Sequence, residues 1–467
     1  MTEAQNTTVS TGTDSKGFSL TIYNQDFAVV REQRQIHLNQ GTNFVRYEDV
    51  AAQIDPTSIS LKSLTAPNGV VVREQNYQYD LLSPSSILNK SVGKTVRFRR
   101  VNPDGQIEVL EGTLLNPPTL NSYKDHGVVI RLSDGRIVLN PAGEIELNEM
   151  PEGLVSRPSL LWKLEVTEAG DHTAEVSYLA NRIAWKADYV AVVNQEENQV
   201  DITGWVTLDN RSGATYLDAQ LQLMAGNVRR RVREPEEFCC EVTADVLGAV
   251  EQLQFQEEAF FEYHLYTLQG TTTVRDSETK QMTLLSAAEV LVGRKLVYDG
   301  RKQLQWGESA PGEGGDTQQG KVSVVLELLN SQENNMGVPL PKGTVRVYKA
   351  DDRGNLHFLG EDSINHTPRN EKVRLYIGDS FDVVGERKRV SLEQISERVT
   401  EESFEISIRN RKQDSAEVSV VERFWGDWQI LKSSHEYSQL DARTVEFTVA
   451  VAADSEVKIT YTVRTIR

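Results

Sequence analysis

Apolar and polar side chains alternate along much of this chain, and the alternation limits its fold more than any other feature of the sequence. In the clearest case, residues 445–451 and 457–463 place apolar side chains at every odd position, with polar or small ones between them. A period of two residues is that of a β-strand with one buried face. Because the short polar stretch 453–455 separates the two runs, they predict a β-hairpin.

The same alternation recurs at short intervals elsewhere, for example at 345–347 and 404–408. No long helical periods separate these runs, and no regular succession of strand and helix indicates a parallel sheet. The sequence therefore predicts an all-β chain, built from tandem antiparallel β-sandwich modules of the immunoglobulin or fibronectin type.

The chain has 467 residues, which is too long for one ordinary hydrophobic core. Five short strand candidates separated by tight-turn residues predict a small SH3-like or Sm-like barrel inserted in a sandwich. The predicted division is a disordered tail at 1–16, an N-terminal β segment at 17–85 that pairs with 154–228, the inserted barrel at 86–153, a central β-sandwich at 154–330, and a C-terminal immunoglobulin-like β-sandwich at 331–467. Within the central sandwich, 235–258 predicts an acidic, partly helical segment, and 308–320 a mobile Gly-rich linker.

Charge restricts the classes of partner. The chain carries 68 acidic and 50 basic residues, a net charge of −18. Such a charge repels phosphate backbones and anionic lipid surfaces, so the sequence predicts no nucleic-acid partner. No run of about 18 apolar residues occurs, so it also predicts no transmembrane segment.

The N-terminal residues are polar and lack the apolar segment of a secretory leader. They predict a cytoplasmic protein, or an exported one if a leader has been removed. The two cysteines, Cys239 and Cys240, are adjacent, so they predict no disulfide framework. Two reduced thiols are the first interpretation. The alternative is a redox or soft-metal contact, for which no third ligand lies nearby.

Four phrases are more specific than composition alone, and they occur in order along the chain. They are YLANRIAWKADYVAVV, GWVTLDNRSGATYLDAQLQLMAGNV, NNMGVPLPKGTVRVYKAD and FLGEDSINHTPRNEKVRLYIGDSFDVVGERK. Together they resemble a bacterial family described as domain of unknown function 4139, the mucoidy-inhibitor-A-like proteins. The likeness covers most of 17–467 and is strongest in 338–388. It implies tandem β-sandwich modules, a bacterial source and exported relatives, and it transfers no catalytic residue to this chain.

One stretch gathers the residue types of acid–base chemistry. It holds Asp362, His366 and Glu371, and Asp382 follows closely. A histidine titrates near neutral pH and can exchange protons with a carboxylate's help. No nucleophile or metal ligand accompanies these residues, so the competing interpretation is a polar loop whose side chains close turns.

Several other patterns lack a residue or a neighbouring element that their function requires. GDSFD around Ser380 lacks the second glycine of a nucleophile turn, and GDTQQGKV (315–322) lacks the hydroxyl and helix of a phosphate-binding loop. No two of the seven histidines lie within four residues of each other, so the sequence predicts no cofactor and no metal site. The basic stripe Arg97, Arg99 and Arg100 is accompanied by acids, which favours a solvated strand face over RNA binding.

Trp425 and Trp428 have two interpretations, a sugar-stacking platform or part of a sandwich core. The leading functional hypothesis is a non-enzymatic interaction or scaffolding protein that presents loops and edge strands to a protein or envelope partner. Its acidic surface predicts a basic patch on that partner. The alternatives are a hydrolase or carbohydrate-active protein centred on His366, and a carbohydrate-binding module that uses the two tryptophans.

Overall fold

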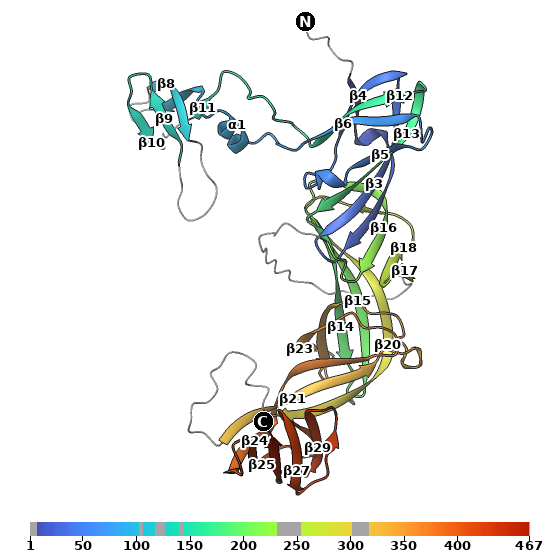
Figure 1. The fold of residues 1–467 in the computed structure, drawn as a ribbon, viewed down its shortest axis with the longest axis vertical. Helices are drawn as coiled ribbons and strands as arrows, with labels where there is room; N and C mark the ends of the chain where they lie inside the picture. Colours follow the sequence, from blue (N-terminus) through green and yellow to red (C-terminus); the bar gives the residue numbers. More distant parts are fainter. Residues whose placement is uncertain are drawn as a thin grey trace. The chain divides into compact units, whose positions relative to one another are not determined.

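The fold is almost entirely β-stranded (Figure 1). The computed structural model describes residues 7–101, 106–116, 127–139, 144–230, 254–300 and 317–466. Within these ranges the only α-helix is the short α1 (Pro84–Lys90), which begins after Ser83, whose hydroxyl accepts the Ser86 N–H at 3.0 Å. No helix in the described ranges is long and apolar enough to cross a bilayer. The prediction of an all-β chain is confirmed.

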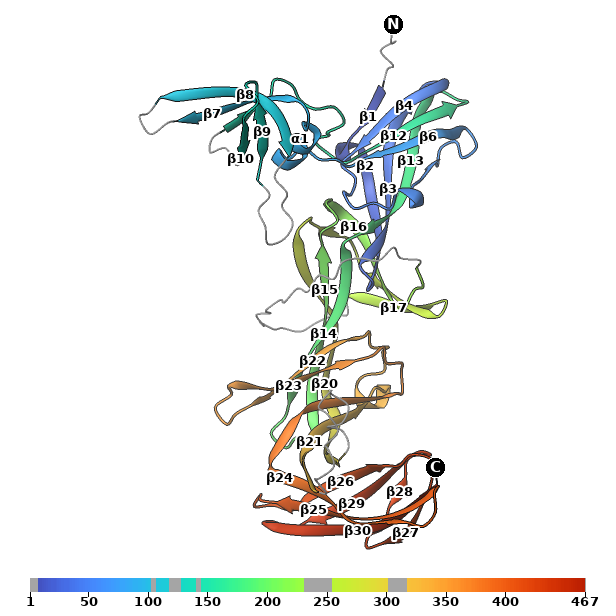
Figure 2. The same cartoon turned by 60° about the vertical axis from the view of Figure 1, so that its left-hand side comes forward.

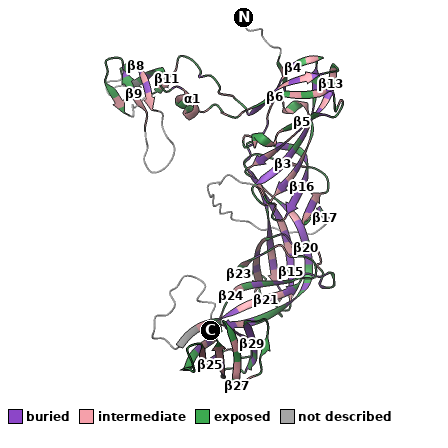
Figure 3. Cartoon of the chain, viewed as in Figure 1, coloured by how far each residue is buried: buried purple, intermediate pink, exposed green. Residues whose placement is uncertain are grey.

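The chain forms two compact units from interleaved segments. Unit 1 comprises residues 1–184, 209–223 and 270–279, and unit 2 comprises residues 185–208, 224–269 and 280–467, each within the described ranges. Buried residues follow the strands of both units, as alternating polarity requires (Figure 3).

Unit 1 contains two sheets that face each other. One has the order β1 (Thr7–Ser10), β4 (Gly41–Glu48), β12 (Ser159–Val166), β6 (Val70–Gln78), and the other includes β16 (Tyr216–Ala225), β2 (Ser15–Tyr23), β3 (Phe27–Leu38), β13 (Gly170–Asn181), β5 (Ser60–Ser63). Strands of the N-terminal segment thus pair with strands of 159–181. Residues 7–16, which the sequence placed in a disordered tail, form β1, the turn Gly12–Asp14 and the start of β2.

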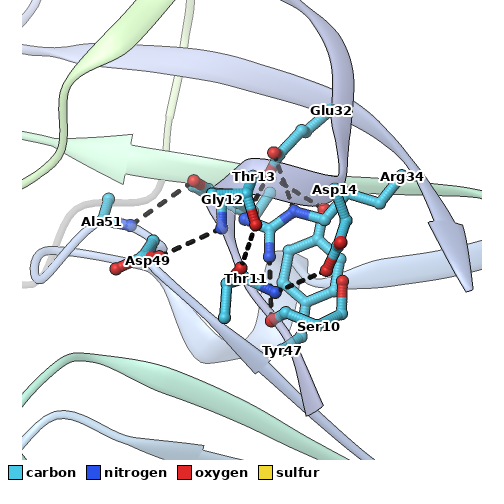
Figure 4. Close-up of polar contacts among 11 residues, drawn as sticks. Ser10, Thr11, Gly12, Thr13, Asp14, Glu32, Arg34, Tyr47, Asp49 and Ala51 are labelled. Carbon is cyan, nitrogen blue, oxygen red and sulfur yellow. Dashed lines mark hydrogen bonds and ion pairs between the residues drawn. The ribbon is translucent and has the colours of Figure 1, made fainter. Parts of the chain in front are cut away.

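A buried ionic cluster joins the two sheets of unit 1 (Figure 4). The Arg34 guanidinium donates from Nε and Nη2 to the two oxygens of Glu32, at 2.8 and 2.9 Å, and from Nη1 to the Ser10 carbonyl at 3.1 Å. Tyr47 donates its hydroxyl to Glu32 at 2.8 Å, and its ring lies 3.6 Å from the guanidinium. Burial lowers the pKa of Arg34, but Glu32 and Tyr47 raise that pKa more, so the arginine stays charged.

The inserted segment forms one five-stranded sheet. Its strand order is β10 (Ile137–Leu139), β9 (Val129–Leu132), β8 (Ile107–Asn116), β7 (Thr95–Val101), β11 (Glu144–Glu146). In the described residues the end strands β10 and β11 do not pair, so the sheet is open and the predicted closed barrel is wrong. Pairing of the edges cannot be inferred from strand periodicity. The SH3-like or Sm-like classification stays a prediction.

Unit 2 is organised around one long sheet. Its main order is β23 (Leu356–Ile364), β22 (Gly343–Ala350), β14 (Ile183–Val193), β15 (Gln199–Asn210), β20 (Glu278–Asp299), β21 (Thr317–Leu329), β24 (Lys372–Gln394), β25 (Val399–Asn410), β30 (Ser455–Ile466), β27 (Asp427–Ser433). Most strand pairs in the described part of the chain are antiparallel, as predicted, but β1–β4, β14–β22 and β20–β26 are parallel.

The predicted C-terminal hairpin is wrong, although both of its strands form (Figure 2). Strand β29 (Thr444–Val451) pairs with β26 (Ala416–Arg423) and β28 (Ser438–Gln439), while β30 pairs with β25 and β27. The apolar faces of β29 and β30 meet in the core instead, where the rings of Phe447 and Tyr461 stack at 5.8 Å. Alternation fixes which face of each strand is buried but not its neighbour in the sheet.

A second buried ionic cluster lies in this C-terminal core. Arg387 donates from Nε to both oxygens of Glu422, at 2.9 and 3.1 Å, and from Nη2 to the Tyr461 hydroxyl at 3.3 Å. Tyr461 donates to Glu422 at 2.6 Å, and the guanidinium lies 3.7 Å from the Phe404 ring. The cluster connects β24, β26 and β30.

Two predicted irregular segments fall mostly outside the described residues. Of the predicted partly helical segment 235–258, the part up to 253, with Cys239 and Cys240, lies outside them, and 255–258 belong to strand β17 (Phe255–Phe260). Of the predicted linker 308–320, residues 308–316 lie outside them, and 317–320 begin β21.

Candidate functional site

Asp362 lies on β23, and its side chain accepts hydrogen bonds from backbone N–H groups. Its carboxylate accepts the N–H of Ser363 at 2.8 Å and the N–H of Tyr376, on β24, also at 2.8 Å. The second bond satisfies a donor of another strand, which backbone pairing would otherwise have to satisfy. This geometry favours a structural role for Asp362, although the residue connects two strands and does not close a loop turn as the sequence predicted.

His366 follows β23 in a loop and is half-buried. Its Nδ1 accepts the backbone N–H of Lys342 at 3.1 Å, so this nitrogen carries no proton in that contact. Burial lowers the pKa of His366, and the charges of Lys342 and His264 lower that pKa further. The imidazole is therefore neutral at pH 7, and it holds the Lys342 loop.

Glu371 and Asp382 have exposed side chains, one just before β24 and the other near the middle of that strand. Their backbone carbonyls have structural partners: the carbonyl of Glu371 accepts the Asn330 N–H, and that of Asp382 accepts the Arg411 N–H. Asp362 thus lies on β23 and His366 in the loop that follows it. Glu371 directly precedes β24, and Asp382 lies within β24. The side-chain contacts of Asp362 and His366 favour a structural role over a paired acid and base.

The two tryptophans have different environments. Trp428 packs against the C-terminal core, with its ring tilted at 39° to that of Phe424 and 4.8 Å from it, and donates its indole N–H to the Ala442 carbonyl at 2.9 Å. Trp425 is 64% exposed, with the Arg443 guanidinium 5.3 Å from its ring. Only Trp425 of this pair presents the open ring that a sugar needs for stacking.

Arg97 and Arg99 lie on an exposed face of the small sheet between acids of the neighbouring strands. Glu146 is opposite Arg97, and Glu144 is opposite Arg99. On the other side Glu111 is opposite Arg97. Opposite charges in adjacent strands neutralise the stripe, which supports the solvated-face interpretation. The side chain of Arg100 lies outside the described residues.

Unit 2 also contains a groove that the sequence did not indicate. It has a volume of about 440 Å³, in the range of small-ligand pockets. One wall is the hairpin of β17 and β18 (Tyr263–Leu268), and the other is formed by two proline loops. The lining residues are Glu257, Glu258, Ala259, His264, Pro339, Pro368 and Arg369.

Glu257 is the polar centre of this groove. One carboxylate oxygen lies 2.7 Å from Nδ1 of His264, and the other accepts from Nη2 of Arg369 at 2.9 Å. The Glu257 side chain is only 13% exposed, so its two partners stabilise a largely desolvated charge. These bonds also connect the hairpin to the Pro368 loop.

Buried side chains of unit 2 hold the two proline loops in place through hydrogen bonds. The buried hydroxyl of Tyr266 donates to the Pro339 carbonyl at 3.0 Å, and burial raises the pKa of this tyrosine. Fully buried Asn330 donates from Nδ2 to the carbonyls of Val338 and Pro368, at 2.8 and 2.9 Å. Rigid walls reduce the conformational entropy lost when a ligand binds.

The polar side chains of the groove can bind a ligand through charge and hydrogen bonds. The lining offers carboxylates, one imidazole and one guanidinium, but no hydroxyl or thiol nucleophile among the described residues. Nowhere in the described ranges do three or more His, Cys, Asp or Glu side chains gather as a metal site would require.

Sequence reasoning missed the groove because its walls are far apart in the chain. Glu257 and Arg369 are 112 residues apart, and neither belongs to a recognisable motif. The available signal was the clustering of prolines in VPLP and HTPRN, which lie where the family resemblance is strongest. These loops carry Pro339 and Pro368.

Comparison with known proteins identifies the family but not the activity. No curated protein matches the chain. A family model described as Domain of unknown function (DUF4139) matches residues 174–465, more than half of the chain. That range contains the groove, the C-terminal core and the four candidate residues around His366. The chain therefore belongs to the DUF4139 family.

Proposed function

We propose that this chain is a non-enzymatic interaction protein, and that it engages a protein partner at the groove of unit 2. The observation that carries the proposal is the way the polar side chains are used. Asp362, His366 and Asn330 hold backbone groups, while the ion pair of Glu257 and Arg369 lines the groove. A rigid groove with a mixed polar and proline lining suits an extended peptide segment.

Affinity purification of the tagged full-length chain, followed by binding of the purified partner, tests this function. The Arg369→Ala variant loses the bond to Glu257 and leaves that carboxylate poorly compensated, so we expect binding to weaken at least tenfold. Arg411→Ala, which breaks an exposed ion pair with Asp454 outside the groove lining, is the matched control and should bind as the wild type does. Equal binding by the wild type and Arg369→Ala would overturn the proposal.

Carbohydrate binding is the second candidate, supported by the exposed ring of Trp425. A sugar would stack on this indole, with Arg443 as a nearby hydrogen-bond donor. Glycan-array binding that Trp425→Ala abolishes would support this function. The matched control is Tyr437→Ala, which removes another exposed ring of the same unit and should leave glycan binding unchanged.

A further inference from the structure

The tip of the β17–β18 hairpin carries an aromatic side chain in an unfavourable backbone conformation. Phe260 pairs with Tyr263, so Phe261 and Glu262 form a two-residue turn. Phe261 has φ of 58°, in the left-handed region. Hairpin turns place Gly, Asn or Asp at such positions, because a side chain with Cβ is crowded there. Of the described non-glycine residues with positive φ, Phe261 is the one aromatic residue.

The same residue is among the most exposed apolar side chains described. Phe261 is 86% exposed, and its neighbour Phe260 is 54% exposed. The Phe261 ring lies 6.2 Å from that of Tyr263, and Tyr263 packs so closely on Gly226 that a Cβ added there would lie 2.3 Å from its ring. Backbone strain and loss of solubility both oppose a phenylalanine at position 261, and the fold gains no core contact in return.

The base of the hairpin is anchored, unlike its tip. Phe255, Leu265 and Tyr266 are buried, and the Tyr266 hydroxyl is bonded to the Pro339 carbonyl. The two strands therefore hold the aromatic tip on a fixed support, and Glu257 and His264 of the same hairpin line the groove. A preformed, exposed aromatic side chain is the usual energetic centre of a protein interface.

Charge around the tip identifies the partner class. Glu258 and Glu262 flank the aromatic residues and are exposed, whereas Glu257 is already paired with His264 and Arg369. Carboxylates repel anionic lipid headgroups, and a second copy of a chain with net charge −18 is also disfavoured. A protein surface with basic residues complements this tip.

Resting on the proposed function, we propose that Phe261 is the anchor residue of the interface. It inserts into an apolar pocket on a partner protein, and Lys or Arg residues around that pocket pair with Glu258 and Glu262.

The test begins with photo-crosslinking and ends with measured affinities. The full-length chain carries p-benzoylphenylalanine at position 261 and is irradiated in the cells that naturally make it. The crosslinked protein is identified by mass spectrometry, purified and titrated against the unmodified chain. Phe261→Gly removes the ring and also relieves the backbone conformation. We expect this variant to bind at least 30-fold more weakly while its melting temperature rises by about 2–4 °C.

Matched variants separate the anchor from general hydrophobicity and charge. Phe381→Ala, which removes a side chain that is 96% exposed on β24, should bind as the wild type does. The double variant Glu258→Lys, Glu262→Lys should bind at least tenfold more weakly, whereas Glu393→Lys, Glu397→Lys should not.

Three results would overturn the inference. The first is a partner that binds Phe261→Gly as tightly as the wild type, which leaves the proposed function intact if Arg369→Ala still weakens binding. The second is flotation of the chain with phosphatidylcholine or phosphatidylserine vesicles that depends on Phe261, which indicates a membrane anchor. The third is self-association that depends on Phe261 in analytical ultracentrifugation.

Discussion

Unit 1 and unit 2 each bury an arginine, a glutamate and a tyrosine in one hydrogen-bonded cluster, but they enclose the arginine to different degrees. Arg34 is fully buried and donates to Glu32 on its own strand and to the Ser10 carbonyl. Arg387 is 8% exposed and donates to Glu422 and Tyr461, which lie on two other strands. The same three residue types thus connect three strands in each unit: β1, β3 and β4 in unit 1, and β24, β26 and β30 in unit 2.

The comparison shows what a buried ion pair requires. A desolvated arginine is tolerated when several acceptors surround it, and losing one acceptor is costly in proportion to its enclosure. Arg34 is fully buried, whereas 8% of the Arg387 surface is already in contact with water. Enclosure, rather than the number of hydrogen bonds, should therefore set the size of a mutation's effect.

The largest effect is expected for Glu32→Ala. This change removes the acceptor of two Arg34 bonds and of the Tyr47 hydroxyl, and it leaves a guanidinium buried without its counter-ion. We expect unit 1 to lose about 3–5 kcal/mol of unfolding free energy in urea denaturation. The control Glu74→Ala breaks an exposed pair with Lys163 and should cost at most about 1 kcal/mol. A Glu32→Ala protein as stable as this control would show that full burial of Arg34 does not make the loss of its counter-ion costly.

Glu422→Ala should have a smaller effect in unit 2, about 2–4 kcal/mol, because Arg387 can regain water contacts. The relevant measurement is the urea transition of the C-terminal core, followed by fluorescence of Trp428, which packs on that core. A cost equal to or above that of Glu32→Ala would show that the enclosure of the arginine does not set the size of the effect.

The tyrosine variants should have smaller effects, since each tyrosine donates one hydroxyl bond to the cluster glutamate. Tyr47→Phe removes that bond, keeps the ring and should cost about 1–2 kcal/mol. Tyr461→Phe should cost slightly more, because it also removes an acceptor of Arg387. Double-mutant cycles with the respective glutamate measure the coupling. Coupling in only one unit would mean that the two clusters are not equivalent.

The smallest effect is expected for Tyr298→Phe, beside the cluster of unit 2. The Tyr298 hydroxyl is buried and has no hydrogen-bond partner among the described residues. Removing it should be neutral or stabilise the protein by up to about 1 kcal/mol. Thermal unfolding measures the change, and a clear loss of stability would reveal a partner for this hydroxyl.

Both clusters could have been predicted from the sequence in part. On β3, Glu32 and Arg34 share the inward phase of Val30, Ile36 and Leu38, and on β26 Glu422 shares the phase of Val418 and Val420. Alternation therefore marks these charges as buried. It cannot show that Arg387 and Glu422 meet, because they come from strands 35 residues apart. The alternation of apolar and polar residues also predicted the buried faces of β29 and β30, but not the strands with which they pair.

The candidate site was less predictable, for a related physical reason. The residues near His366 are neighbours in the sequence, yet Asp362 and His366 contact backbone groups of other segments. The groove depends on Glu257, His264 and Arg369, which only the fold brings together. Spacing in the sequence reveals a site when one segment contributes all of its residues. Three segments form this groove: the β17–β18 hairpin and the loops of Pro339 and Pro368.

We propose that these polar residues hold structure and support binding rather than turnover. The most direct measurement is activity profiling of the purified full-length chain and of His366→Ala against panels of ester, phosphoester, glycoside and peptide substrates. We predict no turnover above the rate of the buffer for either protein. Turnover by the wild type that His366→Ala abolishes would contradict the account.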